Sequence, residues 1–178
     1  MNLRDQIVAE AMTWRHTPYH DHEGLKGFGV DCAHFPLRLC QAFGRAPTDF
    51  KVPYYSPQQW LNSPQQAVSI HSRGKFHLRV EDRTMFNIVA QLAKAELRGP
   101  WNDKPSANIP IIERDPLPAD FVLYKVVASW THLAFIVHWP EFVLHPVIKL
   151  GVIGSHGTNE GFWHRAPRRF FSILGEGE

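Results

Sequence analysis

The chain has 178 residues, of which 44% are hydrophobic, which is enough for one soluble domain with a buried core. A net charge of +2 is too small to indicate nucleic-acid binding, and no apolar run approaches the roughly 20 residues that cross a bilayer, so we expect no membrane insertion. The first residues lack the basic and then apolar layout of a signal peptide, which predicts cytoplasmic synthesis, or carriage in a virion or a similar particle.

The first expected element is a helix that begins after Asn2, a favoured N-cap residue, and whose apolar residues recur at helical spacing. It should end at His16-Thr17-Pro18, because a proline disfavours helix in the residue before it. A loop over 19–30 then leads to a second helix, which we expect to start at Cys32 and to stop near Gly44.

A long insertion is expected between these helices and the rest of the fold, at about 45–117. Its many prolines favour irregular structure, with a strand near 76–80. Asp82 is placed to cap a further helix, which Gly99-Pro100 would end.

Short apolar runs at hairpin spacing follow the insertion and predict an antiparallel sheet. The expected strands are 121–126, 132–137, 142–144 and 152–153, with an edge strand at 170–174. Helices followed by such a sheet are typical of the α+β class, and we expect residues 1–178 to form a single domain.

Cys32 is the candidate nucleophile, because glycines precede it and an apolar, helix-like run follows it. A thiol at the positive end of a helix dipole is favoured as the thiolate. His132 stands at the head of an expected strand, and such a histidine is the usual partner of a nucleophilic cysteine. Cys40 lies eight residues beyond Cys32, about 12 Å along one helix, so we expect no disulfide and interpret Cys40 as a buried thiol.

Several segments, in this order, resemble the NlpC-type cell-wall cysteine peptidases, and most closely the members found in bacteriophage tails. They are Thr17-Pro-Tyr19, Gly27-Phe-Gly-Val-Asp-Cys-Ala33, Val52-Pro-Tyr-Tyr-Ser56, Pro118-Ala-Asp-Phe-Val-Leu-Tyr124, Thr131-His-Leu-Ala-Phe-Ile-Val137, Phe142-Val-Leu-His145 with Gly151-Val152, and Trp163 with Arg165. The resemblance implies a compact papain-like fold, with the nucleophile at a helix start packed on an antiparallel sheet. It also implies hydrolysis of peptide bonds in bacterial peptidoglycan, often between D-glutamate and a diamino acid.

The same resemblance implies a role for each candidate residue. Cys32 would be the nucleophile, His132 the base, and His145 the residue that orients His132. Tyr19 and Asp31 would lie near the oxyanion or the substrate. His156, in an expected turn, remains an alternative to His145, whereas His138 would lie about 20 Å from His132 along a continuous strand.

The chain departs from the family pattern at four positions. Ala33 replaces the usual serine after the cysteine, and Thr131 and Ala119 replace glycines. Pro36 falls in the first turns of the expected Cys32 helix, where its missing N–H removes a hydrogen bond to residue 32, so the helix should start irregularly. None of these changes removes a proposed catalytic group.

Other groupings predict less. His16, His20 and His22 have spacing that resembles a metal site, but Pro18 interrupts any helix that would align them, so we expect no metal and no cofactor. The arginines at 165, 168 and 169 are interpreted as a solvated face. The expected partners are a peptidoglycan stem peptide and phage tail-like proteins, and no nucleic acid. Two alternatives to the hydrolase stay open, namely a structural component of a phage tail-like particle and a thiol-dependent acyl- or amidotransferase.

Overall fold

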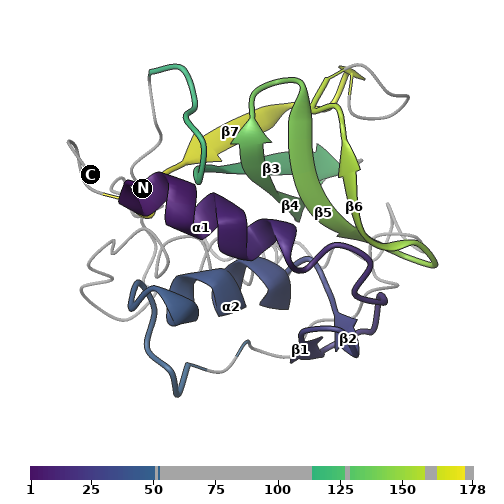
Figure 1. Ribbon diagram of the computed structural model, residues 1–178. Helices are drawn as coiled ribbons and strands as arrows, with labels where there is room; N and C mark the ends of the chain where they lie inside the picture. Colours follow the sequence, from purple (N-terminus) through teal and green to yellow (C-terminus); the bar gives the residue numbers. More distant parts are fainter. Residues whose placement is uncertain (51, 53–113, 127–128, 159–163, 175–178) are drawn as a thin grey trace, which may run out of the picture.

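The computed structural model describes residues 1–50, 52, 114–126, 129–158 and 164–174. In these ranges two helices pack beside a five-stranded antiparallel sheet, and a short two-stranded hairpin lies below them (Figure 1). The α+β class expected from the sequence is therefore confirmed. The helix expected after Asp82, the strand expected near 76–80 and most of the expected insertion lie outside the described residues.

Helix α1 spans Leu3–Met12 and begins where the sequence predicts. The Asn2 side chain accepts a hydrogen bond from the Asp5 N–H at 2.8 Å, and the Asp5 carboxylate accepts one from the Asn2 N–H at 3.2 Å. This reciprocal capping box satisfies N–H groups that have no partner within the helix. The helix ends at Met12, earlier than the boundary expected at His16-Thr17-Pro18.

Helix α2 spans His34–Ala42 and therefore starts two residues after Cys32, not at it as predicted. Pro36 explains the difference, because in the first turn of the observed helix its missing N–H has no intrahelical partner to lose. The other end agrees with the prediction. Gly44 has a φ of 65°, and the Arg45 N–H donates to the Cys40 carbonyl at 2.7 Å, as in a Schellman motif.

The loop expected over 19–30 contains a small hairpin, which the sequence analysis missed. Its strands are β1, Gly24–Leu25, and β2, Gly29–Val30. The turn between them contains Gly27 at a φ of 79°, a backbone conformation that favours glycine. Tyr19 forms a further parallel bridge with Val30, so residues 19–30 fold back on themselves directly before Cys32.

The five strands lie in the order β6-β5-β4-β3-β7, and every neighbouring pair is antiparallel. Their bounds are Phe121–Val126 for β3, Ser129–His138 for β4, Phe142–Val147 for β5, Gly151–Ser155 for β6 and Arg168–Phe171 for β7. All five expected strands are thus present, and the last is an edge strand beside β3. The observed β5 is longer than the expected 142–144 and includes His145.

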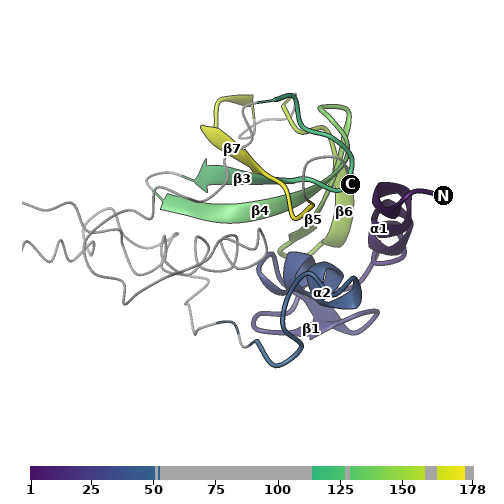
Figure 2. The ribbon, with the colours of Figure 1, turned by 90° about the vertical axis from the view of Figure 1, so that its left-hand side faces the viewer.

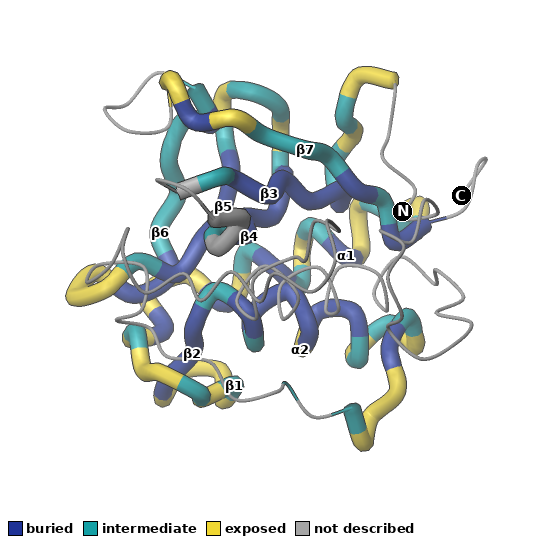
Figure 3. Tube along the Cα trace, turned by 180° about the vertical axis from the view of Figure 1, so that it is seen from behind, coloured by how far each residue is buried: buried dark blue, intermediate teal, exposed yellow. Residues whose placement is uncertain are grey.

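Buried side chains fill both faces of the sheet. On one face α1 and α2 pack against alternate residues of β3, β4 and β5. Figure 2 shows α2 below the strands and α1 beside them, and Figure 3 marks much of α2 and β3 as buried. The members that define this helix-facing core include Ile7, Phe35, Leu39, Phe121, Leu133, Phe135 and Leu144. A second, smaller cluster covers the opposite face and consists of Val122, Tyr124, Ala134, Ile136, Val143 and Ala166. No helix in the described ranges is long and apolar enough to span a membrane.

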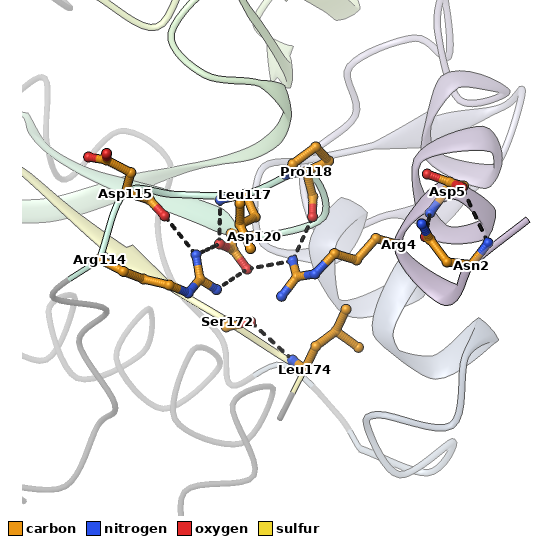
Figure 4. A network of polar contacts seen from close by, with 10 residues as sticks. All are labelled: Asn2, Arg4, Asp5, Arg114, Asp115, Leu117, Pro118, Asp120, Ser172 and Leu174. Atoms are coloured by element: carbon orange, nitrogen blue, oxygen red, sulfur yellow. Dashed lines mark hydrogen bonds and ion pairs between the residues drawn. The ribbon is translucent and has the colours of Figure 1, made fainter. Parts of the chain in front are cut away.

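A fully buried carboxylate, that of Asp120, fastens α1 to the entry of the sheet (Figure 4). Arg4 of α1 donates to it at 3.1 Å and to the Pro118 carbonyl at 2.7 Å, while Arg114 donates to its other oxygen at 2.8 Å. The Leu117 N–H donates to the same carboxylate at 2.8 Å. This network holds the turn at Ala119, whose φ is 70° although it is not a glycine.

Candidate active site

The turn that carries Cys32 is fixed by the residue before it. The Asp31 carboxylate accepts hydrogen bonds from the N–H groups of Ala33 at 3.0 Å, His34 at 2.8 Å and His22 at 2.7 Å. Its side chain is 0% exposed. Asp31 therefore joins the hairpin loop to the turn that precedes α2. Because its side chain is buried, it fixes the backbone on both sides of Cys32 from the protein interior.

The Cys32 thiol is half-buried and lies beside strand β4. The backbone of Leu133 hydrogen bonds to the sulfur. Strand β4 pairs with β5 only from Phe135 onward, where Phe135 lies opposite Leu144. The residues of β4 that precede Phe135 pair with β3 and not with β5 in the described register. The Cys32 turn approaches β4 at this point, and it meets the residue that directly follows His132.

The protonation of Cys32 differs from the prediction. Burial, followed by the charge of the adjacent Asp31, raises the pKa of the Cys32 thiol to about 12, although hydrogen bonds from the Leu133 and Cys32 backbones act in the opposite direction. The expected lowering by the helix dipole was wrong because α2 begins beyond Cys32 and a carboxylate stands beside it. Cys40 is fully buried in the helix-facing core, as expected, and burial raises its pKa as well.

Tyr19 lies close enough to Cys32 for their charges to interact. Burial and then the nearby Cys32 raise the pKa of the Tyr19 hydroxyl, and a side-chain hydrogen bond with Asp21 acts in the same direction. The bridge between Tyr19 and Val30 accounts for this proximity, because Val30 precedes Asp31 and Cys32. The structure thus places Tyr19 near the Cys32 thiol.

His132 and His145 form a direct pair. Nε2 of His132 lies 2.7 Å from Nδ1 of His145, and the rings meet edge to face with centroids 5.0 Å apart. His145 is only 2% exposed, and its other nitrogen, Nε2, lies 2.9 Å from the hydroxyl of Ser155 on β6. Three polar groups on three adjacent strands therefore form a continuous hydrogen-bonded row.

Both imidazoles of this row are held in the neutral form. Burial, and then the neighbouring His145, place the pKa of His132 well below its usual value of 6.5. Burial alone lowers the pKa of His145 to about 4. A neutral imidazole has one N–H and one lone pair, so the partner of one nitrogen decides what the other nitrogen can do.

The two competing histidines lie elsewhere. His138 is exposed and contacts Glu141 at 2.8 Å. Nδ1 of His156 accepts a hydrogen bond from the Thr158 N–H at 3.1 Å. Of the two candidates for the partner of His132, His145 has a ring nitrogen within hydrogen-bond distance of it, at 2.7 Å. Among the residues that the structure describes, no group of three or more His, Cys, Asp or Glu side chains could hold a metal ion.

Two residues of this neighbourhood were missed by the sequence analysis. The sequence analysis considered His156 and did not consider its neighbour Ser155. Pairing the strand that carries His145 with the strand that carries Ser155 would have suggested Ser155 as a partner of His145. Tyr124 pairs with His132 across β3 and β4, with ring centroids 6.3 Å apart, and its hydroxyl donates to the Gly157 carbonyl at 3.0 Å. Tyr124 thus supports the position of the His132 ring.

Comparison of the chain with models of protein families and with curated protein sequences gave no match.

Proposed function

We propose that this protein is an NlpC-type cysteine hydrolase that cleaves peptide bonds in the stem peptides of bacterial peptidoglycan. The observation that supports it most directly is the hydrogen bond of 2.7 Å between His132 and His145, together with the hydrogen bond from the backbone of the next residue, Leu133, to the Cys32 sulfur. The resemblance of the sequence to the NlpC-type peptidases supplies the substrate class. A nucleophile, a base and a residue that orients the base are the three groups that acyl transfer requires.

The first step follows from the neutral state of both groups. Cys32 is a thiol and His132 a neutral base, so the proton leaves sulfur for Nδ1 of His132 as the sulfur attacks the carbonyl carbon. We assign the hydrogen of neutral His132 to Nε2, which lies 2.7 Å from Nδ1 of His145, so the imidazolium that forms donates to His145. The same proton then passes from Nδ1 to the leaving amine as the C–N bond breaks, which leaves a thioester on Cys32.

Hydrolysis of the thioester repeats these proton transfers in reverse. His132 takes a proton from water, the hydroxide oxygen attacks the thioester carbon, and the thiol is released with the proton returned to it. The negative oxygen that forms in each step needs hydrogen-bond donors. The backbone N–H of Cys32, in the turn that Asp31 holds, and the hydroxyl of the nearby Tyr19 are our candidates for this role.

The test is cleavage of soluble muropeptides by the purified chain, followed by mass spectrometry and by the appearance of new amino groups. We expect Cys32→Ala to abolish cleavage, because the other thiol of the sequence, Cys40, is fully buried in the core. The matched control is Cys40→Ala, which removes the second thiol from the core and should retain cleavage as long as the protein stays folded. Undiminished cleavage by Cys32→Ala would refute the proposal.

The same assay separates the two alternatives. A thioester that passes to an added amine faster than to water would indicate an acyl- or amidotransferase. Absence of cleavage by a folded wild-type chain, together with binding to a tail protein that Cys32→Ala leaves unchanged, would indicate a structural component of a tail-like particle.

A further inference from the structure

Ser155 stands behind His145, on the side away from His132. It is the last residue of β6, and the register places Ser155 opposite Val143 and His145 opposite Ile153, so the two are diagonal neighbours on adjacent strands. The Ser155 hydroxyl oxygen lies 2.9 Å from Nε2 of His145. Diagonal pairs of this kind are within reach of longer side chains, and the geometry here is that of a hydrogen bond.

The chemistry of this row allows only two arrangements of its protons. In one, Nε2–H of His145 donates to Ser155 and Nδ1 of His145 accepts from Nε2–H of His132. In the other, Ser155 donates to Nε2 of His145, and Nδ1–H of His145 donates to Nε2 of His132. A serine hydroxyl can both donate and accept, so it is compatible with either, and its presence alone does not decide between them.

We propose that Ser155 is a positioning residue that holds His145 as its Nε2–H tautomer, so that His132 presents the lone pair of Nδ1 toward the thiol. This inference rests on the proposed function, since it assigns the residue that sets the state of the same site. In this role Ser155 acts through His145, which its hydroxyl contacts.

The direction of the two hydrogen bonds made by His145 follows from the role of His132 as a base. When His132 takes the thiol proton, both of its nitrogens carry hydrogen, and Nε2–H needs an acceptor. Nδ1 of His145 can accept only if the proton of His145 is already on Nε2, and that proton needs its own acceptor within a side chain that is 2% exposed. The Ser155 oxygen supplies it. In the opposite arrangement two N–H groups would face each other as soon as His132 became charged.

A matched pair of variants isolates the hydroxyl. Ser155→Thr keeps it, and Ser155→Val has nearly the shape of threonine without it, while both suit a strand. The first readout is the ring ¹⁵N spectrum of the full chain labelled at histidine, with the signals of His145 assigned through His145→Gln. We expect the Nε2–H tautomer in the wild type and in Ser155→Thr, and a shift to the Nδ1–H tautomer in Ser155→Val. The wild-type tautomer in Ser155→Val would overturn the proposal.

The second readout is muropeptide cleavage. We expect Ser155→Val to lower kcat/KM about tenfold and Ser155→Thr to restore most of it, as loss of one oriented hydrogen bond implies. Ser172→Ala is the control, because it removes a hydroxyl that accepts from the Leu174 N–H, away from the row, and should leave the rate unchanged. Equal rates in Ser155→Val and the wild type would also overturn the proposal.

The two readouts distinguish failure of the positioning role of Ser155 from failure of the proposed function. If the tautomer changes as expected but no variant and no wild-type preparation cleaves muropeptides, the role of Ser155 in positioning His145 stands and the proposed substrate is wrong. If Ser155→Val does not fold, Ser155→Ala, which leaves space where valine adds volume, takes its place with the same expected spectrum.

Discussion

At the scale of single residues, burial sets the chemistry of the site. Cys32 stays a thiol because burial and Asp31 raise its pKa, and His132 stays neutral because burial and His145 lower its pKa. Cys32 and His132 could be proposed from residue type and position in the sequence, whereas His145 was proposed because of the family resemblance. Their protonation could not, since it depends on which side chains exclude water, and this emerges only from the fold.

The buried His145 should make the stability of the protein depend on pH. Its pKa is lowered from 6.5 to about 4, so between these values the unfolded state binds a proton that the folded state does not. The stability is fully present above pH 6.5 and is lost as the pH falls toward 4, by roughly 3 kcal/mol if His145 acts alone. The glutamine of His145→Gln cannot bind this proton. In this variant the free energy of unfolding, measured with urea, should therefore change less between pH 6.5 and pH 4. An unchanged slope in His145→Gln would contradict the assignment.

At the scale of elements, the start of α2 determines how far Cys32 benefits from the helix. Pro36 lacks the N–H that would otherwise donate to the Cys32 carbonyl. We therefore expect Pro36→Ala to extend α2 toward Cys32 and to lower the pKa of its thiol, because the sulfur would then lie nearer the positive end of the helix. Alkylation of Cys32 by iodoacetamide, mapped by mass spectrometry, should become faster at neutral pH.

The control for this prediction is Pro47→Ala, which changes an exposed proline in the loop after α2 and should leave the alkylation profile of Cys32 as it is. An identical profile in Pro36→Ala and the wild type would show that the helix start does not govern the thiol. Cys40 in the same digest reports whether the core has opened.

The elements themselves were predictable in different degrees. The N-cap at Asn2, the glycine end of α2 and the five strands follow local rules, and they were found from the sequence. The hairpin at 24–30 was missed because its strands have two residues each, which is too short for any alternation to show. Ser155 was missed because its role depends on the register between β5 and β6, which the strand pattern of a single segment does not contain.

At the scale of the whole molecule, the Asp120 network joins parts of the chain that are distant in sequence. Arg4 and Asp120 lie 116 positions apart, so nothing in the local sequence could predict their contact. Ala119 stands where the resembling family has a glycine, and its φ of 70° is a conformation that favours glycine. The turn lies beside the Asp120 carboxylate, which two arginines hold.

Neutralising this carboxylate should destabilise the whole fold. Asp120→Asn leaves two arginine charges, one of them mostly buried, without their counter-ion, and such a loss costs about 3 kcal/mol or more. Asp115→Asn is the matched control, since Asp115 is exposed and only its backbone carbonyl accepts from Arg114. Urea unfolding should show a large decrease for the first variant and little change for the second. Equal midpoints would mean that the network contributes specificity of folding rather than stability.

The same network has a consequence for how this chain could change over generations. Arg114 is tied to Asp120, and on the other side of the undescribed stretch Phe50 and Val52 pack against the helix-facing core. Both attachment points are thus anchored independently of what joins them, and the entropy of closing a connection grows only slowly with its length. We therefore expect changes in the length of the segment between these two attachment points to disturb the described helices and sheet least.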